Sequence, residues 1–138
     1  MKIITLKEVE YMAFRLAGEL MSFNEPIPDF STRFPNRLES CLATPFQSFS
    51  GSSPYKDFIS KASVLFYLMI KNHPFQNGNK RIAMTTLFVF LHMNDKWLAV
   101  DTQELYNFTM WIAQSPPKAK DEAVMATEKF LRSHLIGL

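Results

Sequence analysis

Apolar residues recur at helical spacing in six segments of the chain, and short polar breakers separate these segments. This spacing places apolar side chains on one face of a helix, so each segment predicts an amphipathic helix. The predicted helices run from about Leu6 to Met21, Asn36 to Leu42, Ser53 to Lys71, Asn79 to Met93, Asp101 or Thr102 to the Ser115-Pro116-Pro117 stop, and Lys118 to His134. The pattern therefore predicts an all-α fold, a compact bundle of about six helices.

Residues at the segment ends support these boundaries. Thr5-Leu6-Lys7-Glu8 has the form of a capping box, and the proline-containing stretch Asn24 to Asp29 would end the first helix. Ser53 and Pro54 suit the cap and first turn of the third helix. The run Trp97 to Val100 is short and apolar, with extended character.

The segment Pro45 to Ser53 is the one place where the pattern favours a mobile loop or a small β-hairpin. Phe46 and Phe49 stand there among small polar residues. Two interpretations remain open, because the aromatic rings either anchor the loop in the core or line a binding surface.

Composition narrows the class of protein. With 138 residues, a single domain spanning 1–138 is expected, and 47% hydrophobic residues provide enough material for one core. The net charge of +2 is too small to favour direct binding of nucleic acid. Cys41 is the sole cysteine, so it is expected to be a small buried side chain in a reducing compartment. No segment resembles a signal peptide or a membrane span, and a cytoplasmic location is expected.

The candidate chemistry lies in the nine residues His73-Pro74-Phe75-Gln76-Asn77-Gly78-Asn79-Lys80-Arg81, hereafter the motif. The motif precedes and opens a predicted helix, whose N-terminus favours anions. Gly78 allows close approach of the backbone, and Lys80 and Arg81 add positive charge. His73 is a proton-transfer group one turn upstream. The residues alone predict a phosphate-binding turn beside a candidate base.

The motif resembles the signature of the Fic/Doc family, His-x-Phe-x-(Asp/Glu)-Gly-Asn-(Gly/Lys)-Arg. A lysine at the eighth place, here Lys80, is the form of the Doc (death-on-curing) branch, the toxins of toxin–antitoxin pairs. The segment Arg37-Leu38-Glu39-Ser40-Cys41-Leu42-Ala43-Thr44-Pro45 is similar to a second segment of that branch. The resemblance extends from Thr5 to about Val100. It implies the Fic/Doc fold, with the loop before the third helix as a hairpin flap.

The resemblance also implies roles for individual residues. His73 would be the general base that takes the proton from an attacking hydroxyl on a target protein. The residues that would hold the phosphates of ATP are Gly78, Asn79, Lys80 and Arg81. Phe75 would fix the loop as a core anchor.

Lys80 and Met84 bear on the kind of group that is transferred. Family members that transfer AMP have glycine at the first of these places and a second arginine at the other. The Lys80 form goes with transfer of the γ-phosphate of ATP, so the resemblance implies a protein phosphotransferase. Its target by analogy would be a translation elongation factor. AMP transfer remains the less favoured alternative.

Asn77 departs from the family, which has an acidic Mg²⁺ ligand at this place. An amide oxygen can coordinate Mg²⁺ but brings no charge. Three interpretations stay open: a working site with a weaker metal, a silenced relative that acts as a nucleotide- or partner-binding regulatory module, and slow conversion of Asn77 to Asp or isoAsp at the Asn-Gly sequence.

A partner chain is also expected. The Ser/Thr-x-x-x-Glu-(Gly/Asn) motif with which some Fic proteins inhibit themselves does not occur, since Ser22-Phe23-Asn24-Glu25 is one residue too short. The resemblance therefore implies inhibition by a separate antitoxin, whose disordered tail folds as a helix in a groove.

Overall fold

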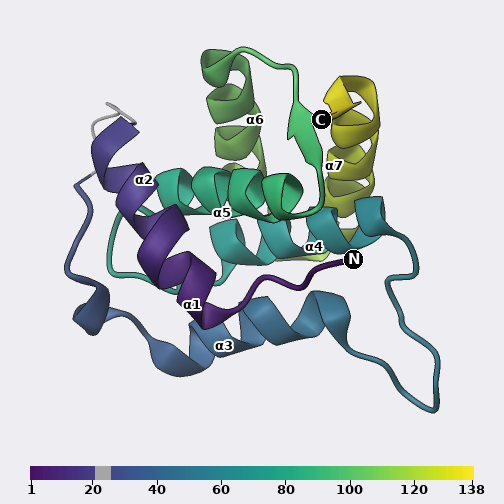
Figure 1. The fold of residues 1–138 in the computed structure, drawn as a ribbon, viewed down its shortest axis with the longest axis horizontal. Coiled ribbons are helices and arrows are strands. Elements are labelled where there is room, and N and C mark those ends of the chain that lie inside the picture. The colour runs from purple at the N-terminus through teal and green to yellow at the C-terminus, as the bar shows by residue number, and fades with distance from the viewer. Residues whose placement is uncertain (21–25) are drawn as a thin grey trace.

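The computed structural model describes residues 1–20 and 26–138, and these form a helical bundle (Figure 1). Its helices are α1 (Leu6–Glu8), a π-helical turn (Val9–Ala13) and α2 (Phe14–Leu20), which follow one another directly, then α3 (Pro35–Ala43), α4 (Phe58–Lys71), α5 (Asn79–Met93), α6 (Thr102–Gln114) and α7 (Lys120–His134). Short 3₁₀ turns occur at Phe30–Thr32, Thr44–Phe46 and Pro117–Ala119. If the first three are counted as one helix, the described residues form six, and the all-α prediction is confirmed.

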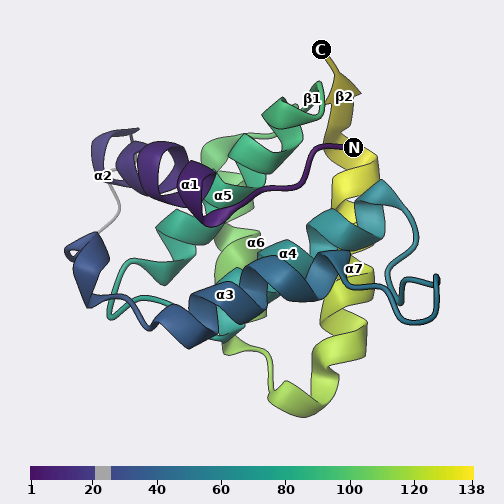
Figure 2. The ribbon, with the colours of Figure 1, turned by 60° about the horizontal axis from the view of Figure 1, so that its bottom comes forward.

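Helices α4 and α5 form the centre of the bundle. Every residue of α4 from Ala62 to Ile70 is buried, as expected for a helix enclosed by others. The first helix and α3 pack on one side, and α6 and α7 pack on the other (Figures 1 and 2). Cys41 is fully buried as predicted, and burial raises the pKa of its thiol to about 12. No helix among residues 1–20 and 26–138 is long and apolar enough to cross a membrane.

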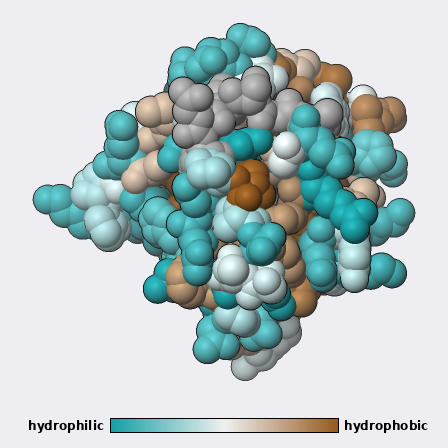
Figure 3. Space-filling view, turned by 90° about the vertical axis from the view of Figure 1, so that its left-hand side faces the viewer, coloured by the Kyte–Doolittle hydropathy of each residue, from teal (hydrophilic) through white to brown (hydrophobic). Residues whose placement is uncertain are grey.

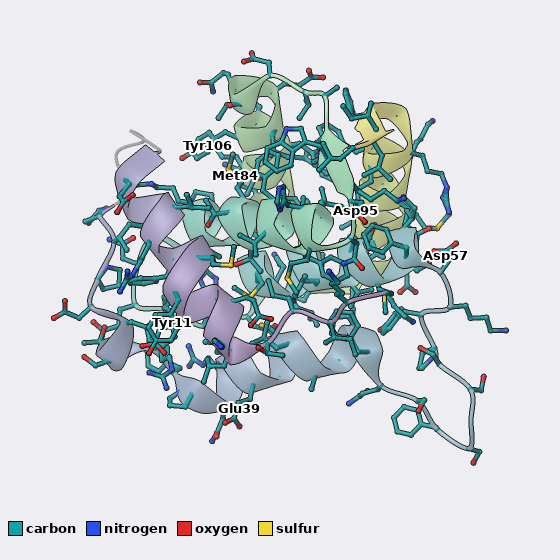
Figure 4. The ribbon with its side chains drawn as sticks, viewed as in Figure 1. Tyr11, Glu39, Asp57, Met84, Asp95 and Tyr106 are labelled. Carbon is teal, nitrogen blue, oxygen red and sulfur yellow. The ribbon has the colours of Figure 1, made fainter. Side chains whose placement is uncertain are left out.

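The start of α4 differs from the prediction. The helix begins at Phe58 with Asp57 as its N-cap, because the Asp57 carboxylate accepts a hydrogen bond of 2.7 Å from the Ser60 amide (Figure 4). The Ser53 hydroxyl donates instead to the Tyr55 carbonyl, at 2.9 Å. The predicted cap at Ser53 is therefore wrong, because its side chain closes a local turn.

Other helix ends agree better with the pattern. Helix α5 has the predicted bounds, and α7 begins two residues late because a 3₁₀ turn precedes it. The predicted end of the first helix at Met21 lies outside the described residues, as does the beginning of the Asn24–Asp29 breaker.

A small antiparallel sheet joins the end of α5 to the end of the chain. Strand β1 (Lys96–Leu98) pairs with β2 (Leu135–Gly137), and Trp97 lies opposite Ile136. The pattern indicated extended structure near β1 but not the pairing with β2. The sheet thus links the end of α7 to the end of α5, while α7 itself packs on α4. The Trp97 ring packs on Phe88 with centroids 4.7 Å apart.

Residues 46–53, hereafter the flap, project from the bundle between α3 and α4 (Figures 1 and 2). Their hairpin consists of one antiparallel bridge, in which the Phe49 and Ser52 backbones exchange hydrogen bonds of 2.7 and 3.0 Å. Phe46 packs on Phe90 at 5.5 Å, whereas the Phe49 side chain is 61% exposed. Each of the two interpretations thus applies to one ring: Phe46 is an anchor, and Phe49 is available for binding.

Candidate active site

His73 lies where α4 ends, in a backbone conformation that is rare for its residue type. Helix α4 stops at Lys71 with Asn72 as C-cap, and His73 follows with φ of 46°. The residue after a C-cap is commonly glycine, because a side chain in the left-handed region costs roughly 1–2 kcal/mol. The imidazole is exposed. Strain of this kind at a non-glycine residue is maintained only where neighbours enforce it.

The beginning of α3 holds the two carbonyl groups of this turn. The Phe34 amide donates to the Pro74 carbonyl at 2.8 Å, and Arg37 Nη1 donates to the His73 carbonyl at 3.3 Å. The Arg37 guanidinium also lies over the Phe34 ring, 4.2 Å from its centroid. Arg37 has no role predicted from the sequence, although the residue opens the second segment of the resemblance. We regard Arg37 as a positioning residue for the backbone of His73.

Phe75 anchors the turn in the core, as predicted. Its side chain is 1% exposed and packs against Phe14 and Phe30, with ring centroids 5.6 and 5.8 Å away. Asn79 ties the same residue to α5, because its side chain accepts from the Phe75 amide at 3.0 Å and donates to the Phe75 carbonyl at 2.9 Å. These contacts fix the separation between His73 and the start of α5.

Gly78 is the N-cap of α5, and both its conformation and its surroundings require glycine. Its φ is 73°, and a Cβ atom there would lie 2.6 Å from Ile27 Cδ1 and 3.1 Å from the Pro26 carbonyl oxygen. The amides of the first turn of α5 have no acceptor within the helix, and they lie at the positive end of its dipole. Residues 73–78, hereafter the motif turn, therefore lead from the exposed imidazole to an anion-attracting helix end.

The predicted phosphate-binding side chains differ in burial and in hydrogen-bond partners. Lys80 is partly buried. Arg81 is 6% exposed, and its Nη2 donates to the Ala17 carbonyl of α2. Asn79 is 7% exposed and has its amide committed to Phe75. In this arrangement Arg81 joins α5 to the first helix, and Asn79 can offer an anion its main-chain N–H.

Asn77 is exposed in the motif turn, and its side chain is engaged locally. Its Oδ1 accepts a hydrogen bond from the Gly78 amide at 2.8 Å. Within residues 1–20 and 26–138, no group of three or more His, Cys, Asp or Glu residues could hold a metal ion. Mg²⁺ in proteins is typically held by one or two carboxylates together with substrate phosphates. The described residues thus do not fit a Mg²⁺ site of their own, and the role of Asn77 as a metal ligand stays a prediction.

Met84 lies one helical turn after Arg81 on α5 and is fully buried (Figure 4). As a methionine it adds no positive charge at this place. The face on the left of Figure 1, where the motif turn joins α4 to α5, is largely hydrophilic around a smaller hydrophobic area (Figure 3).

Comparison with known proteins identifies the family of the chain. A model described as the Fic/DOC family matches residues 4–91. Toxin Doc from Mycolicibacterium smegmatis (strain ATCC 700084 / mc(2)155) is 34% identical over 64 residues, which are 46% of this chain and 49% of the relative. The chain thus matches about half the length of that relative, and no solved structure matches. The protein belongs to the Fic/Doc family, and within it the chain is similar to the Doc branch.

Proposed function

We propose that this protein is a Doc-like toxin that transfers the γ-phosphate of ATP to a hydroxyl group of a target protein. Fic/Doc proteins are generally transferases with a nucleotide substrate. The proposal is supported by the motif turn, in which His73 is exposed with a left-handed backbone and the following Phe75 is hydrogen-bonded to Asn79 in the first turn of α5. A base and an anion-attracting surface on one rigid turn are what phosphoryl transfer to a hydroxyl requires.

In the proposed reaction, His73 takes the proton from the target hydroxyl. The freed oxygen attacks the γ-phosphorus, the bond from that phosphorus to the β–γ bridging oxygen breaks, and ADP leaves. The main-chain amides at the start of α5 and the Lys80 ammonium stabilise charge on the phosphates. Gly78 is required at this helix end, because its φ is positive and a side chain there would clash with Ile27. Arg81, buried against α2, holds this helix end in place and contributes its charge to the field.

Two features favour γ-phosphate over AMP transfer. Lys80 occupies the place where AMP-transferring relatives have glycine, and the buried Met84 occupies the place of their second arginine. Without that arginine, the orientation that presents the α-phosphate to the target loses a stabilising charge. We therefore expect the γ-phosphate to face the target.

The flap supplies a surface for the target. Its backbone is paired only across one bridge, and Phe49 is exposed at its end. An extended segment of the target, a translation elongation factor by analogy, would add to the flap as a strand. We expect Phe49→Ala to reduce target modification. If Phe46→Ala and Phe49→Ala both leave modification unchanged in folded protein, the flap has no such role.

We further propose that a separate antitoxin chain inhibits this protein. An apolar groove of about 240 Å³ lies between the first helix and α5, lined by Met12, Leu16, Phe88, Val89, His92 and Trp97. Side chains along one face of an amphipathic helix suit such a groove. Copurification of the chain with the product of the neighbouring gene should be lost in Met12→Glu. If copurification persists, the partner binds another surface.

The transfer reaction is tested with ATP labelled in parallel at the γ- or the α-phosphate, with Mg²⁺ and purified translation factors. We expect label on one factor from γ-labelled ATP alone, and loss of that label in His73→Ala. His92→Ala is the matched control, because His92 is an exposed histidine at the far end of α5 and should leave the rate unchanged.

The other outcomes separate the alternatives. Label from α-labelled ATP would establish AMP transfer and overturn the role given to Lys80. An absence of label from either nucleotide, in protein that still binds ATP, would make the chain a silent regulatory module.

A further inference from the structure

The motif turn contains an amide where the family has a carboxylate, and its geometry favours a particular reaction of that amide. Asn77 is exposed, and Gly78 follows it without a Cβ atom. The Gly78 amide nitrogen lies 2.8 Å from Asn77 Oδ1. The main-chain nitrogen that must attack thus lies beside the side-chain amide group, and the hydrogen bond that it donates to Oδ1 has to open before it can attack Cγ.

Asn79, two residues later in the same chain, provides the contrast. Its side chain is 7% exposed, and both its oxygen and its nitrogen are hydrogen-bonded to the Phe75 backbone. Its neighbour is Lys80 and not glycine. Of the asparagines in the sequence, Asn77 alone precedes a glycine.

We propose that Asn77 is a site of spontaneous deamidation, and that its conversion to aspartate supplies the carboxylate that the motif turn lacks. The Gly78 nitrogen attacks Asn77 Cγ, a bond forms between them, the bond from Cγ to the side-chain nitrogen breaks, and ammonia leaves. The product is a cyclic imide. Water then opens the ring, so the sum of the reaction is replacement of ammonia by water with no oxidant or reductant.

The ring opens in two ways with different consequences. Attack of water at Cγ gives aspartate, with the main chain unchanged. Attack at the main-chain carbonyl gives isoaspartate, which adds a methylene to the backbone directly before Gly78. Because Gly78 is packed against Ile27 and Pro26, the longer backbone displaces the start of α5. The aspartate product alone keeps the observed turn.

An aspartate at this place has two oxygens for two tasks. One continues to accept the Gly78 amide, and the other faces solvent, where it can bind a divalent cation carried by nucleotide phosphates. This consequence rests on the proposed function, whereas the deamidation itself does not. The protein would thus acquire its cation ligand with age after synthesis.

The experiment follows the purified chain over time at mildly alkaline pH. Peptide mapping with fragmentation that separates aspartate from isoaspartate gives the conversion at each asparagine. We expect Asn77 to convert at least about tenfold faster than Asn79, whose amide must first break two hydrogen bonds. A synthetic peptide covering residues 72–81 gives the rate without the fold, and Asn77→Gln is the slow control.

Two results would overturn the proposal: equal rates at Asn77 and Asn79, or an unchanged Asn77 in the folded chain at a time when the peptide has converted. Mg²⁺-dependent binding of ATP is then compared in Asn77→Asp and Asn77→Gln. Tighter binding by Asn77→Asp alone supports the assigned consequence, and equal binding overturns it. If Asn77 converts but neither the aged protein nor Asn77→Asp transfers phosphate, the proposed function fails while the modification site stands.

Discussion

The motif turn and the flap share an unusual backbone feature in very different settings. Each has a non-glycine residue and a glycine in the left-handed region: His73 and Gly78 in the motif turn, with φ of 46° and 73°, and Ser50 and Gly51 in the flap, with φ of 53° and 79°. Around Gly78, a Cβ atom would meet Ile27 at 2.6 Å, whereas around Gly51 nothing lies within 4 Å.

Phe75 of the motif turn and Phe49 of the flap differ in the same direction, whereas Phe46 at the start of the flap packs on Phe90. Phe75 is 1% exposed inside a cluster of rings, and Phe49 is 61% exposed. Left-handed residues are thus held by tertiary packing in the motif turn, where they are separated in the chain, and by one bridge in the flap, where they are adjacent. A preorganised turn suits catalysis, because reacting groups must be held in place, and a loosely held one suits binding to a partner's strand.

The test with the largest expected effect compares Phe75→Ala with Phe49→Ala. Removal of the buried ring leaves a cavity between Phe14 and Phe30, so we expect a loss of about 3–5 kcal/mol in the free energy of unfolding. Removal of the exposed ring should change it by less than about 0.5 kcal/mol. Urea unfolding followed by circular dichroism measures both. Similar losses in the two variants would mean that the flap packs as firmly as the motif turn.

The second test compares Gly78→Ala with Gly51→Ala. A side chain at either position costs roughly 1 kcal/mol, because both have positive φ. Gly78→Ala adds a clash with Ile27, so we expect a total loss of about 2 kcal/mol at this position. Equilibrium unfolding again gives the values.

A double substitution isolates the clash. Ile27→Ala combined with Gly78→Ala should restore part of the additional loss, since it removes the atom that lies closest to the new Cβ. If the losses of the two single substitutions simply add in the double variant, the loss in Gly78→Ala comes from the positive φ of the backbone alone.

The sequence predicted what local patterns determine. The bounds of α5 followed from its apolar spacing, and the burial of Phe75 agreed with the role implied by the motif. The start of α4 was missed because Ser53 and Asp57 are both good caps by local rules. The choice depends on which side chain reaches a free amide in the folded chain.

Other features depend on residues far apart in the chain. Strand β2 has no pattern of its own and exists through its pairing with Lys96–Leu98. The contact of Arg37 with the His73 carbonyl joins a side chain to a main-chain atom 36 positions away. Such contacts leave no periodic signal, so the motif identified the candidate base but not the residue that positions it.

Arg37 gives the third test, on activity. We expect Arg37→Ala to slow γ-phosphate transfer about five- to tenfold, because one hydrogen bond worth about 1 kcal/mol no longer holds the His73 carbonyl. The NMR signals of the His73 ring should broaden or shift. Arg33→Ala is the matched control. The Arg33 guanidinium lies 4.4 Å from the centroid of the Phe30 ring and donates to the Phe30 carbonyl, and the structure shows no contact of it with the described residues of the motif turn. Equal slowing in both variants would point to a general effect of charge.

Asp57 gives the smallest expected effect, at the N-cap of α4 after the flap. The hydrogen bond from the Ser60 amide lowers the pKa of its carboxyl, and the nearby Arg132 guanidinium at 3.5 Å adds to the effect. Because the pKa is lower in the folded chain, the carboxylate stabilises the fold above pH about 4, and this contribution is lost as the pH falls through the lowered value.

Asp57→Asn keeps a good N-cap but removes the charge. We therefore expect the free energy of unfolding of the wild type to exceed that of Asp57→Asn by less than about 1 kcal/mol at neutral pH. The difference should vanish in acid. Urea midpoints at neutral and acidic pH measure it, and proteolysis within the flap should rise in the variant while the motif turn stays intact. A difference that persists in acid would show that the carboxylate charge is not its source.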